Sequence, residues 1–207
     1  MQQRALFLDR DGTLIYPVHF PTRPEQIHLY ENLGPELQVL AALGFLLVVI
    51  TNQSGLARGY FTEGQLTRMH DHLRAQLQEL GVELAGIYFC PHHPEGTVAE
   101  LAIECECRKP APGMLLQAAA DLDLDLARSW FVGDILDDVE AGERAGCRTV
   151  LVDQGTEASP THPTRQPDFV ARNTLHALQI IHTVEQPGAA VDLSYQPSSW
   201  QVKQESN

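Results

Sequence analysis

The sequence is poor in positive charge: among its 207 residues, 14 lysines and arginines stand against 27 aspartates and glutamates, and the formal net charge is −13. A strongly acidic surface repels nucleic acids and anionic lipids at long range. We therefore expect neither a nucleic acid nor a membrane among the partners. An anionic ligand would need a pocket in which the few basic side chains are concentrated.

Long apolar runs are also absent. None approaches the roughly 20 residues that a membrane-spanning helix needs, and the N-terminus has no basic segment followed by an apolar one, as a signal peptide would have. We therefore expect a cytoplasmic protein. Its 43% of hydrophobic and 20% of charged residues are typical of a globular domain, and its length allows one domain with a well-buried core.

Cysteine is scarce as well, since the chain has only four. Cys147 stands apart from the others, and we interpret it as a small buried hydrophobic residue. The other three lie close together, between residues 90 and 107. An odd number of neighbouring cysteines in a cytosolic protein favours a metal site over disulfide bonds.

That stretch carries Cys90-x-His92 followed by Cys105-x-Cys107. Thiolate and imidazole ligands suit tetrahedral Zn²⁺, and four protein ligands would make the site structural. His93 is the competing ligand, and we favour His92 because the Cys-x-His spacing mirrors the Cys-x-Cys spacing. The alternative is a group of free thiols and surface histidines. A zinc ion would staple a loop that ends directly before a pair of basic residues.

Short apolar runs alternate with helical patterns along the chain. Continuous apolar runs of this length are typical of strands buried on both faces, as in a parallel sheet. The predicted strands are Ala5–Asp9, Phe45–Thr51, Gly86–Cys90, Ser129–Asp134 and Thr149–Asp153. The predicted helices cover residues 35–44, 62–81, 112–122 and 137–146. The alternation predicts an α/β fold, a doubly wound Rossmann-like parallel sheet with helices on both faces.

The helix predicted over residues 62–81 opens with Thr62-x-x-Gln65, the pattern of a capping box. Its leucines and methionine form one apolar stripe, and we expect His70 and His72 on the opposite side, facing solvent. Residues 183–207 are rich in Pro, Ser and Gln and show no helical or strand period, which predicts a flexible tail. Residues 1–182 are predicted to form a single domain.

Polar residues follow the predicted strands where these end. In open α/β sheets, ligands bind beyond the carboxyl ends of the strands, so we expect these side chains to converge at one edge of the sheet. The segments are Asp9-Arg10-Asp11-Gly12-Thr13 after the first strand, Thr51-Asn52-Gln53-Ser54-Gly55 after the second, Gly133-Asp134 after the fourth with Asp137 and Asp138 behind it, and Arg108-Lys109-Pro110 before a helix.

Asp9 and Asp11 are like charges two residues apart, and their repulsion needs compensation. A Mg²⁺ ion would supply it, because Mg²⁺ prefers oxygen ligands and is typically held by one or two carboxylates plus a phosphate. Asp9 and Asp134 are its candidate side-chain ligands, and Asp11 offers its backbone carbonyl. Lys109 offsets the remaining negative charge and holds a phosphate oxygen. Asp9 could then attack phosphorus, while Asp11 protonates the leaving oxygen and later activates water.

The segment "DRDGT", Thr51 after an apolar strand, Lys109 before a helix and "GDILDD" resemble, in order, the four motifs of the haloacid dehalogenase superfamily of phosphatases. The resemblance implies that Asp9 is the nucleophile, which forms an aspartyl-phosphate, and that Asp11 is the acid/base. It also implies that Thr51 and Lys109 bind the transferred phosphoryl group and that Asp134 completes the Mg²⁺ site, with Asp138 in support. No large insertion separates the motifs, so we expect a minimal cap made of residues 16–31 and the zinc loop.

A longer pattern, "TNQSGLARGYF" together with "CPHHP" and "CECRKP", resembles the family of D-glycero-D-manno-heptose 1,7-bisphosphate 7-phosphatases. This resemblance implies a Mg²⁺-dependent phosphomonoester hydrolase that removes one phosphate from a sugar bisphosphate during the synthesis of nucleotide-activated heptose. Arginine binds a second, unreacted phosphate well, because its guanidinium can donate two parallel hydrogen bonds. The predicted substrate-binding residues are Thr51, Asn52, Gln53, Ser54, Arg58, Arg108 and Lys109.

Three alternatives stay open at this point. Histidinol-phosphate phosphatases share the zinc loop, although their second motif tends to differ after "TNQ". A nucleic-acid 3′-phosphatase of the same superfamily is disfavoured by the charge of −13 and by the lack of a basic stripe. A zinc-stapled binding module without catalysis is disfavoured by the intact aspartate and lysine motifs. We expect a monomer that acts on a small sugar bisphosphate.

Overall fold

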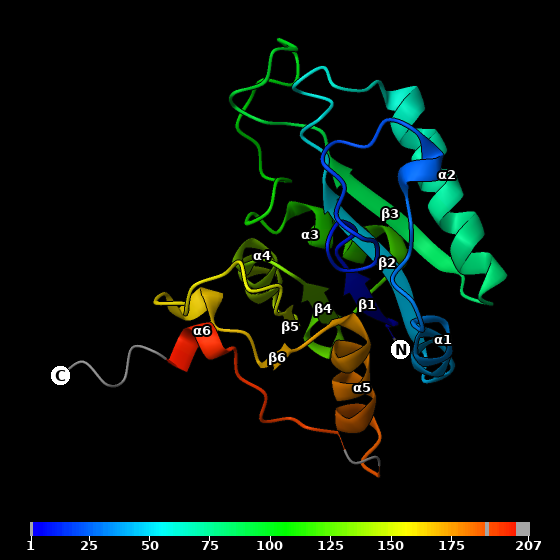
Figure 1. The fold of residues 1–207 in the computed structure, drawn as a ribbon, viewed down its shortest axis with the longest axis vertical. Helices are drawn as coiled ribbons and strands as arrows, with labels where there is room; N and C mark the ends of the chain where they lie inside the picture. The colour runs from blue at the N-terminus through cyan, green and yellow to red at the C-terminus, as the bar shows by residue number, and fades with distance from the viewer. Residues whose placement is uncertain (1, 189–190, 202–207) are drawn as a thin grey trace.

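The computed structural model describes residues 2–188 and 191–201. A six-stranded parallel sheet, in the order β3-β2-β1-β4-β5-β6, forms its centre, with helices on both faces (Figure 1). The strands are β1 (Arg4–Leu8), β2 (Phe45–Asn52), β3 (Leu84–Cys90), β4 (Trp130–Gly133), β5 (Arg148–Val152) and β6 (Phe169–Ala171). The helices are α1 (Gly34–Ala42), α2 (Glu63–Glu79), α3 (Gly113–Leu122), α4 (Leu136–Ala145), α5 (Thr174–Glu185) and α6 (Ser198–Gln201), with short 3₁₀ helices η1 (Pro24–Gln26), η2 (Leu126–Arg128) and η3 (Pro163–Arg165). The predicted doubly wound α/β fold is confirmed.

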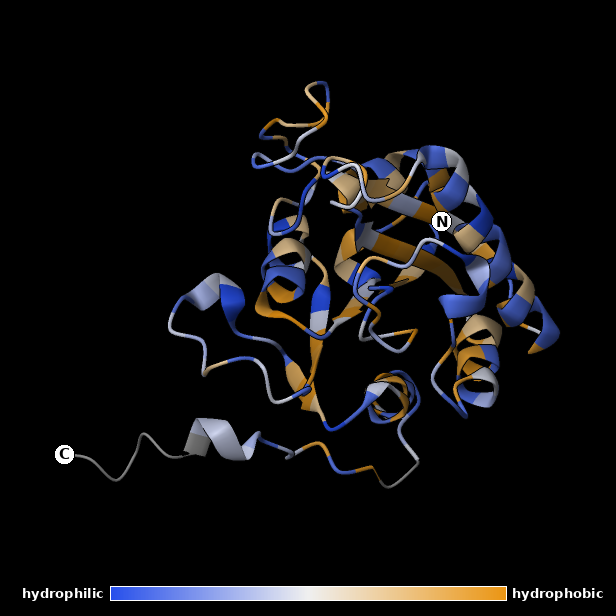
Figure 2. Ribbon diagram, turned by 45° about the horizontal axis from the view of Figure 1, so that its top comes forward, coloured by the Kyte–Doolittle hydropathy of each residue, from blue (hydrophilic) through white to orange (hydrophobic). Residues whose placement is uncertain are grey.

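The two faces of the sheet are buried under different helices. Alternate residues of a strand point to opposite faces, so Leu6 and Leu8 of β1 pack in a core with α1, α2 and α5. Ala5 and Phe7 of the same strand pack with α3 and α4. Figure 2 shows apolar strands at the centre and mostly polar residues on the outer faces of the helices. A strand buried on both faces has no room for an alternating polar pattern, which is why its sequence is continuously apolar.

The strand order determines where a ligand can bind. The chain runs from β1 outward to β3, then returns to β4 on the other side of β1 and continues outward to β6. The carboxyl ends of β1 and β4 therefore lie side by side at the point where the strand order reverses. Crevices at such switch points are the usual ligand sites of open α/β sheets, and Asp9 and Asp134 follow these two strands directly.

All five predicted strands and all four predicted helices are present, with small differences at their ends. The sequence analysis missed β6, which is only three residues long, α5, which packs against α1, and α6, a short helix within the predicted tail. The predicted domain boundary at residue 182 falls inside α5. Beyond it, the Tyr195 hydroxyl donates to Asp153 Oδ2 at 2.8 Å, while residues 189–190 and 202–207 of the predicted tail lie outside the described residues. The division into a domain and a flexible tail stays a prediction.

The two connections near the site, from β1 to α1 and from β3 to α3, contain little secondary structure. Within the described residues, η1 is the only helix between β1 and α1, and the segment between β3 and α3 contains neither helix nor strand. The predicted minimal cap is therefore confirmed. Among residues 2–188 and 191–201, which the structure describes, no helix combines the length and the apolar character that crossing a bilayer requires.

Helix α2 begins as predicted but orients one histidine differently. The Thr62 hydroxyl accepts a hydrogen bond from Gln65 N at 3.3 Å, and Gln65 Oε1 accepts one from Thr62 N at 2.8 Å, which confirms the capping box. His72 is half-buried, but the prediction that His70 faces solvent was wrong: its side chain is buried, 8% exposed, and packs edge-on against Phe89. The buried face of α2 is therefore wider than its apolar stripe and includes His70.

The buried position of His70 predicts a stability that depends on pH. Burial, together with the nearby Arg10 and Arg74 cations, lowers the pKa of His70 from 6.5 to about 3. The unfolded chain therefore takes up a proton below pH 6.5 that the folded chain refuses, so stability falls as the pH falls through this range. At pH 5 the loss amounts to about 2 kcal/mol.

We expect His70→Gln to lack this loss. Chemical denaturation of the parent and the variant between pH 5 and pH 7.5, at constant metal concentration, measures the difference. His72→Gln is the matched control on the same helix and should keep the parent's pH dependence. A His70→Gln curve parallel to that of the parent would contradict a neutral buried imidazole.

Candidate active site

The turn after β1 explains the spacing of the first two aspartates. Ile15 N and Leu14 N both donate to Arg10 O, and Gly12 N donates to Ile15 O, so the chain reverses within a few residues. Gly12 has φ +86°, which favours glycine, and a Cβ atom there would lie 2.2 Å from Asp134 Oδ2. Glycine at this position therefore lets the Asp134 carboxylate approach the turn.

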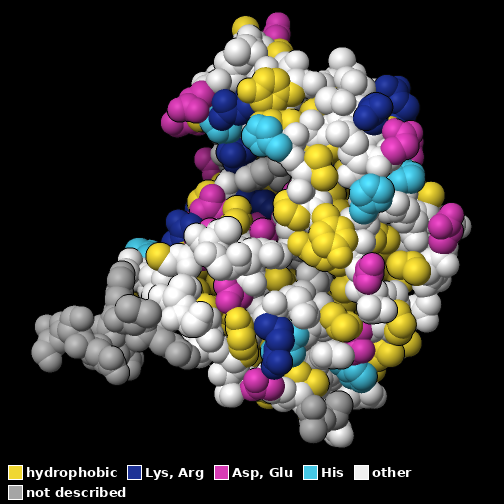
Figure 3. All heavy atoms as spheres, in the orientation of Figure 1, with side chains coloured by type: hydrophobic (Ala, Val, Ile, Leu, Met, Phe, Trp, Pro, Cys, Tyr) yellow, Lys and Arg dark blue, Asp and Glu magenta, His cyan; other side chains and the backbone are white. Residues whose placement is uncertain are grey.

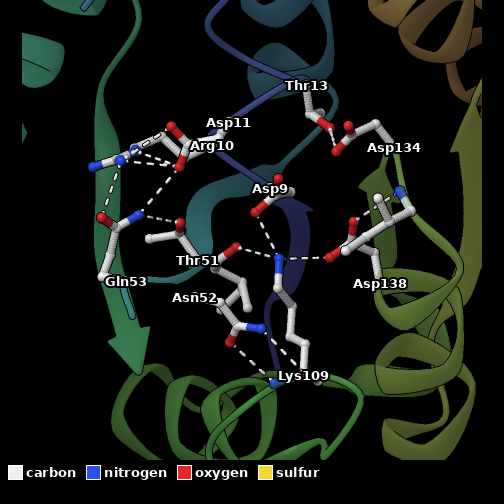
Figure 4. A network of polar contacts seen from close by, with 12 residues as sticks. Asp9, Arg10, Asp11, Thr13, Thr51, Asn52, Gln53, Lys109, Asp134 and Asp138 are labelled. Carbon is white, nitrogen blue, oxygen red and sulfur yellow. Dashed lines mark hydrogen bonds and ion pairs between the residues drawn. The ribbon is translucent and has the colours of Figure 1, made fainter. Parts of the chain in front are cut away.

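Three carboxylates meet beyond the ends of β1 and β4, as Figure 4 shows. Carboxylate oxygens of Asp9, Asp134 and Asp138 lie within 4.8 Å of one another. Lys109 Nζ lies 2.6 Å from Asp9 Oδ1 and 2.5 Å from Asp138 Oδ1, so the ammonium is placed between the two. The sequence treated Asp138 as a supporting carboxylate, and the structure puts it in direct contact with the lysine.

Burial makes this cluster electrostatically strained. Desolvation, opposed by Lys109 and reinforced by the neighbouring carboxylates, raises the pKa of Asp9 well above its usual value. Desolvation and the Asp138 charge raise the pKa of Asp134 to about 7. Burial alone would lower the pKa of Lys109, but Asp138 and Asp9 outweigh it and raise the pKa of the ammonium. One lysine cannot neutralise three carboxylates, two of them buried and one half-buried, so the cluster has an excess of negative charge when all three are ionised.

The cluster fits a divalent cation that prefers oxygen ligands. Its side-chain donors are all carboxylates, with no sulfur or nitrogen ligand among them, and three such oxygens within 4.8 Å could contact a common ion. The Asp11 side chain is not part of this group. Its carboxylate points to the other side of the turn, toward Arg10 and Gln53, which leaves only its backbone carbonyl as a candidate ligand.

Three of the predicted substrate-binding residues, Thr51, Asn52 and Ser54, follow strand β2 or end it. Thr51 is buried next to the cluster, and its hydroxyl accepts from Gln53 Nε2 at 2.8 Å. Asn52 uses its side chain to hold the Lys109 backbone, accepting from Lys109 N at 3.1 Å and donating to Lys109 O at 3.2 Å. Ser54 lines a cavity of about 220 Å³ that Asp11 also borders.

The two arginines of the predicted set lie farther out, against the zinc loop. Arg58 Nη2 contacts both ring nitrogens of His93 and lies 3.5 Å from Glu95 Oε2. Arg108 lines a second cavity of about 370 Å³ together with Lys109 and Arg144. Figure 3 shows basic, acidic and histidine side chains around a hollow beneath the loop at the top of the view.

The four predicted zinc ligands come together at the base of this loop. Cys107 Sγ lies 3.1 Å from Cys90 Sγ, 3.3 Å from Cys105 Sγ and 3.4 Å from His92 Nδ1. In a tetrahedral zinc site with zinc–sulfur bonds of about 2.3 Å, neighbouring ligand atoms lie roughly 3.5–3.8 Å apart, so these four atoms need only a small expansion to bind an ion. The competing ligand His93 is not in the group and contacts Arg58 instead.

Sequence reasoning overlooked two residues of the site. The sequence analysis gives Arg10 no role of its own within the first polar segment and expects His70 on the surface of α2. Arg10 is buried, 1% exposed, and contacts both Asp11 and His70. A charged residue inside an otherwise tightly constrained turn was the available signal for Arg10, whereas nothing local to α2 indicates that His70 faces a buried cation.

The fold and the site define the chain as a hydrolase of the haloacid dehalogenase type, and comparisons with known proteins agree. Residues 106–177 match the family described as HAD-hydrolase-like. The chain is 46% identical over 152 residues, 73% of its length and 81% of the relative's, to D-glycero-beta-D-manno-heptose-1,7-bisphosphate 7-phosphatase from Yersinia pestis. It is 41% identical over 165 residues, 79% of its length and 87% of the relative's, to the D-glycero-alpha-D-manno-heptose-1,7-bisphosphate 7-phosphatase of Photorhabdus laumondii.

A solved structure gives the same result. The D,D-heptose 1,7-bisphosphate phosphatase of B. bronchiseptica, crystallised with magnesium and phosphate, matches with a TM-score of 0.75 and 31% identity over 87% of this chain and 99% of the other. The chain therefore belongs to the heptose-1,7-bisphosphate 7-phosphatase family of the haloacid dehalogenase superfamily. It is a phosphatase, as the sequence motifs predicted.

Proposed function

We propose that the chain is a Mg²⁺-dependent phosphatase that removes the 7-phosphate of D-glycero-D-manno-heptose 1,7-bisphosphate through an aspartyl-phosphate on Asp9. The observation that supports this proposal is the group of Asp9, Asp134 and Asp138, in which Lys109 pairs with Asp9 and Asp138. Asp9, Asp134 and the Asp11 carbonyl are the residues that would hold the cation. When bound, Mg²⁺ would offset the excess negative charge and keep Asp9 ionised at neutral pH.

The chain's own residues account for the steps. An Asp9 carboxylate oxygen attacks phosphorus, the bond to the ester oxygen breaks, and Asp11 gives its proton to that oxygen. Asp11 then takes a proton from water as the water oxygen attacks phosphorus, which releases phosphate and restores the Asp9 carboxylate. Lys109 and Thr51 bind the oxygens of the transferred group, and Asn52 fixes Lys109 through its backbone.

The substrate is inferred from the relatives and from the charge near the site. The relatives at 46% and 41% identity are both named for heptose 1,7-bisphosphate. Arg108 and Arg144 line one cavity, together with Lys109 and with the acidic residues Glu104 and Asp137. The guanidinium of Arg108 is the candidate group there for an unreacted second phosphate. We infer a small-molecule substrate and no nucleic acid, in a cytoplasmic protein.

We further propose that Zn²⁺ is bound by Cys90, His92, Cys105 and Cys107 in a structural role. The four ligand atoms are already grouped, and Arg108 Nη1 donates to His92 O at 3.4 Å. The ion would therefore fix the loop that precedes Lys109. The loop, residues 91–112, contains no helix or strand that could hold it in place when the ion is absent.

A side-by-side assay tests the substrate. We expect phosphate release in the presence of Mg²⁺ with a kcat/KM for heptose 1,7-bisphosphate at least about tenfold above those for histidinol phosphate and a 3′-phosphorylated oligonucleotide. One charge-assisted hydrogen bond to a second phosphate, at about 1.5–3 kcal/mol, accounts for such a ratio. Both anomers of the bisphosphate should be assayed, since the relatives include both types. A preference for histidinol phosphate would overturn the substrate and leave the chemistry intact.

A further inference from the structure

The side chain of Arg10 makes more polar contacts than any neighbour in the turn after β1. Nε donates to Asp11 Oδ2 at 3.0 Å, and Nη2 donates to Asp11 Oδ1 at 3.1 Å, so the guanidinium grips both carboxylate oxygens as a fork. Nη2 also donates to Gln53 Oε1 at 3.1 Å, and Nη1 lies 3.3 Å from His70 Nε2. The Arg10 side chain is only 2% exposed, although it is charged.

Gln53 closes the arrangement from the other side. Its Nε2 donates to Asp11 Oδ2 at 3.1 Å and to Thr51 Oγ1 at 2.8 Å, while its Oε1 accepts from Arg10. The side chain is buried, and both ends of its amide are used within the protein. This pattern differs from that of a residue whose amide is free to bind substrate, which is the role the sequence suggested.

We infer that Arg10, Gln53 and His70 form a cradle that fixes the orientation of the Asp11 carboxylate toward the leaving group, with Arg10 as its principal positioning residue. The inference rests on the proposed function, in which Asp11 is the acid/base. The Asp11 side chain is 31% exposed, and it borders the 220 Å³ cavity with Arg10, Asn52 and Ser54. The carboxylate is thus open to a ligand on one side and held by the cradle on the other.

The geometry of the fork supports a positioning role. Two parallel hydrogen bonds fix the plane of a carboxylate as well as its distance. Any rotation of Asp11 away from the cavity would leave the buried Arg10 cation without its carboxylate partner, which is strongly unfavourable. His70 completes the cradle as a neutral acceptor, since burial and the two nearby arginines lower the pKa of its imidazole.

The test compares two substrates whose leaving groups differ in their need for a proton. The alkoxide that leaves from heptose 1,7-bisphosphate must be protonated, whereas 4-nitrophenolate leaves from 4-nitrophenyl phosphate with little help. For both esters, kcat/KM reports phosphoryl transfer to Asp9 and not the later attack by water. A displaced Asp11 therefore slows the first substrate selectively, while damage to the fold or to the metal site slows both.

For Arg10→Lys, which keeps the charge and loses the fork, we expect kcat/KM to fall at least about 30-fold on the sugar ester and less than about threefold on the aryl ester. For His70→Leu, we expect kcat/KM on the sugar ester to fall about threefold or more, with a smaller change on the aryl ester. His70→Gln should have the parent kcat/KM on both esters, because its amide oxygen can accept a hydrogen bond from Arg10. Arg68→Lys is the control: Arg68 is exposed on the same helix as His70 and is not part of the cradle, and both substrates should be unaffected.

Equal losses on the two esters in Arg10→Lys and His70→Leu, or no loss on the sugar ester in either, would overturn the cradle. If Arg10→Lys does not fold, the two His70 variants decide the question by themselves. Different results would contradict the proposed function itself: the parent would hydrolyse neither ester with Mg²⁺, or Asp9→Asn would hydrolyse both.

Discussion

Asp9→Asn is expected to lower kcat to below about one ten-thousandth of the parent value, with Mg²⁺ at saturation. Loss of a covalent nucleophile is among the most costly single changes in an enzyme, and no other carboxylate can replace Asp9 at the end of β1. Asp134 and Asp138 reach the cluster from β4 and α4, and Asp11 is held by Arg10 on the far side of the turn. Phosphate release from heptose 1,7-bisphosphate under steady-state conditions measures the effect.

The fold should survive this substitution. Asparagine removes one of three crowded negative charges, and desolvation already opposes ionisation of Asp9. Circular dichroism and the thermal midpoint should therefore stay close to those of the parent. Asp71→Asn is the control for loss of one carboxylate, because Asp71 is exposed on α2 and is not part of the carboxylate cluster, and its activity should stay within about twofold. A well-folded Asp9→Asn protein with parental activity would refute covalent catalysis at this residue.

Cys107→Ser is expected to abolish stoichiometric zinc binding and to lower kcat/KM at least about tenfold. Cys107 Sγ is within 3.4 Å of the other three ligand atoms, and structural zinc sites depend on a complete set of four ligands. Loss of the ion frees a loop that orders only at an entropic cost. That loop runs directly into Arg108 and Lys109, so Lys109 should become less well positioned beside Asp9. Elemental analysis of the purified protein and the phosphate-release assay measure the two effects.

Cys147→Ala is the matched control for this experiment. Cys147 is also buried and belongs to the same core cluster as Cys90, but it is not among the four grouped ligand atoms, and its loss should leave one zinc ion per chain. Unchanged zinc content in Cys107→Ser would contradict the zinc assignment. Lost zinc with full activity would instead contradict the idea that the ion positions Lys109.

The sequence predicted the sheet and the principal site because both depend on local patterns. The strand ends and the residues that follow them are adjacent in the chain, so parallel topology alone brings Asp9, Thr51 and Asp134 to one edge. The spacing of two Cys/His pairs likewise predicted, without any knowledge of the fold, which four Cys and His side chains come together. The short strand β6 gave too weak a pattern, and the burial of His70 depends on a contact with Arg10, 60 residues earlier.

The two amide side chains at the end of β2 show most clearly what the sequence could not predict, namely their hydrogen-bond partners. Asn52 and Gln53 follow Thr51 directly and resemble ligand-binding amides in sequence. In the folded chain, Asn52 clamps the backbone of Lys109, and Gln53 holds Asp11. Which hydrogen-bond partner an amide takes depends on tertiary distances, and no sequence pattern contains these.

The pairing of β1 with β4 has a consequence for synthesis of the protein. Asp9 and Thr51 emerge early from the ribosome, whereas Asp138 emerges only once α4 has been translated. Until then the nascent chain holds Asp9 and Lys109 without Asp138, the second carboxylate that pairs with the lysine. A translation product that ends before β4 would therefore lack the group of carboxylates formed by Asp9, Asp134 and Asp138.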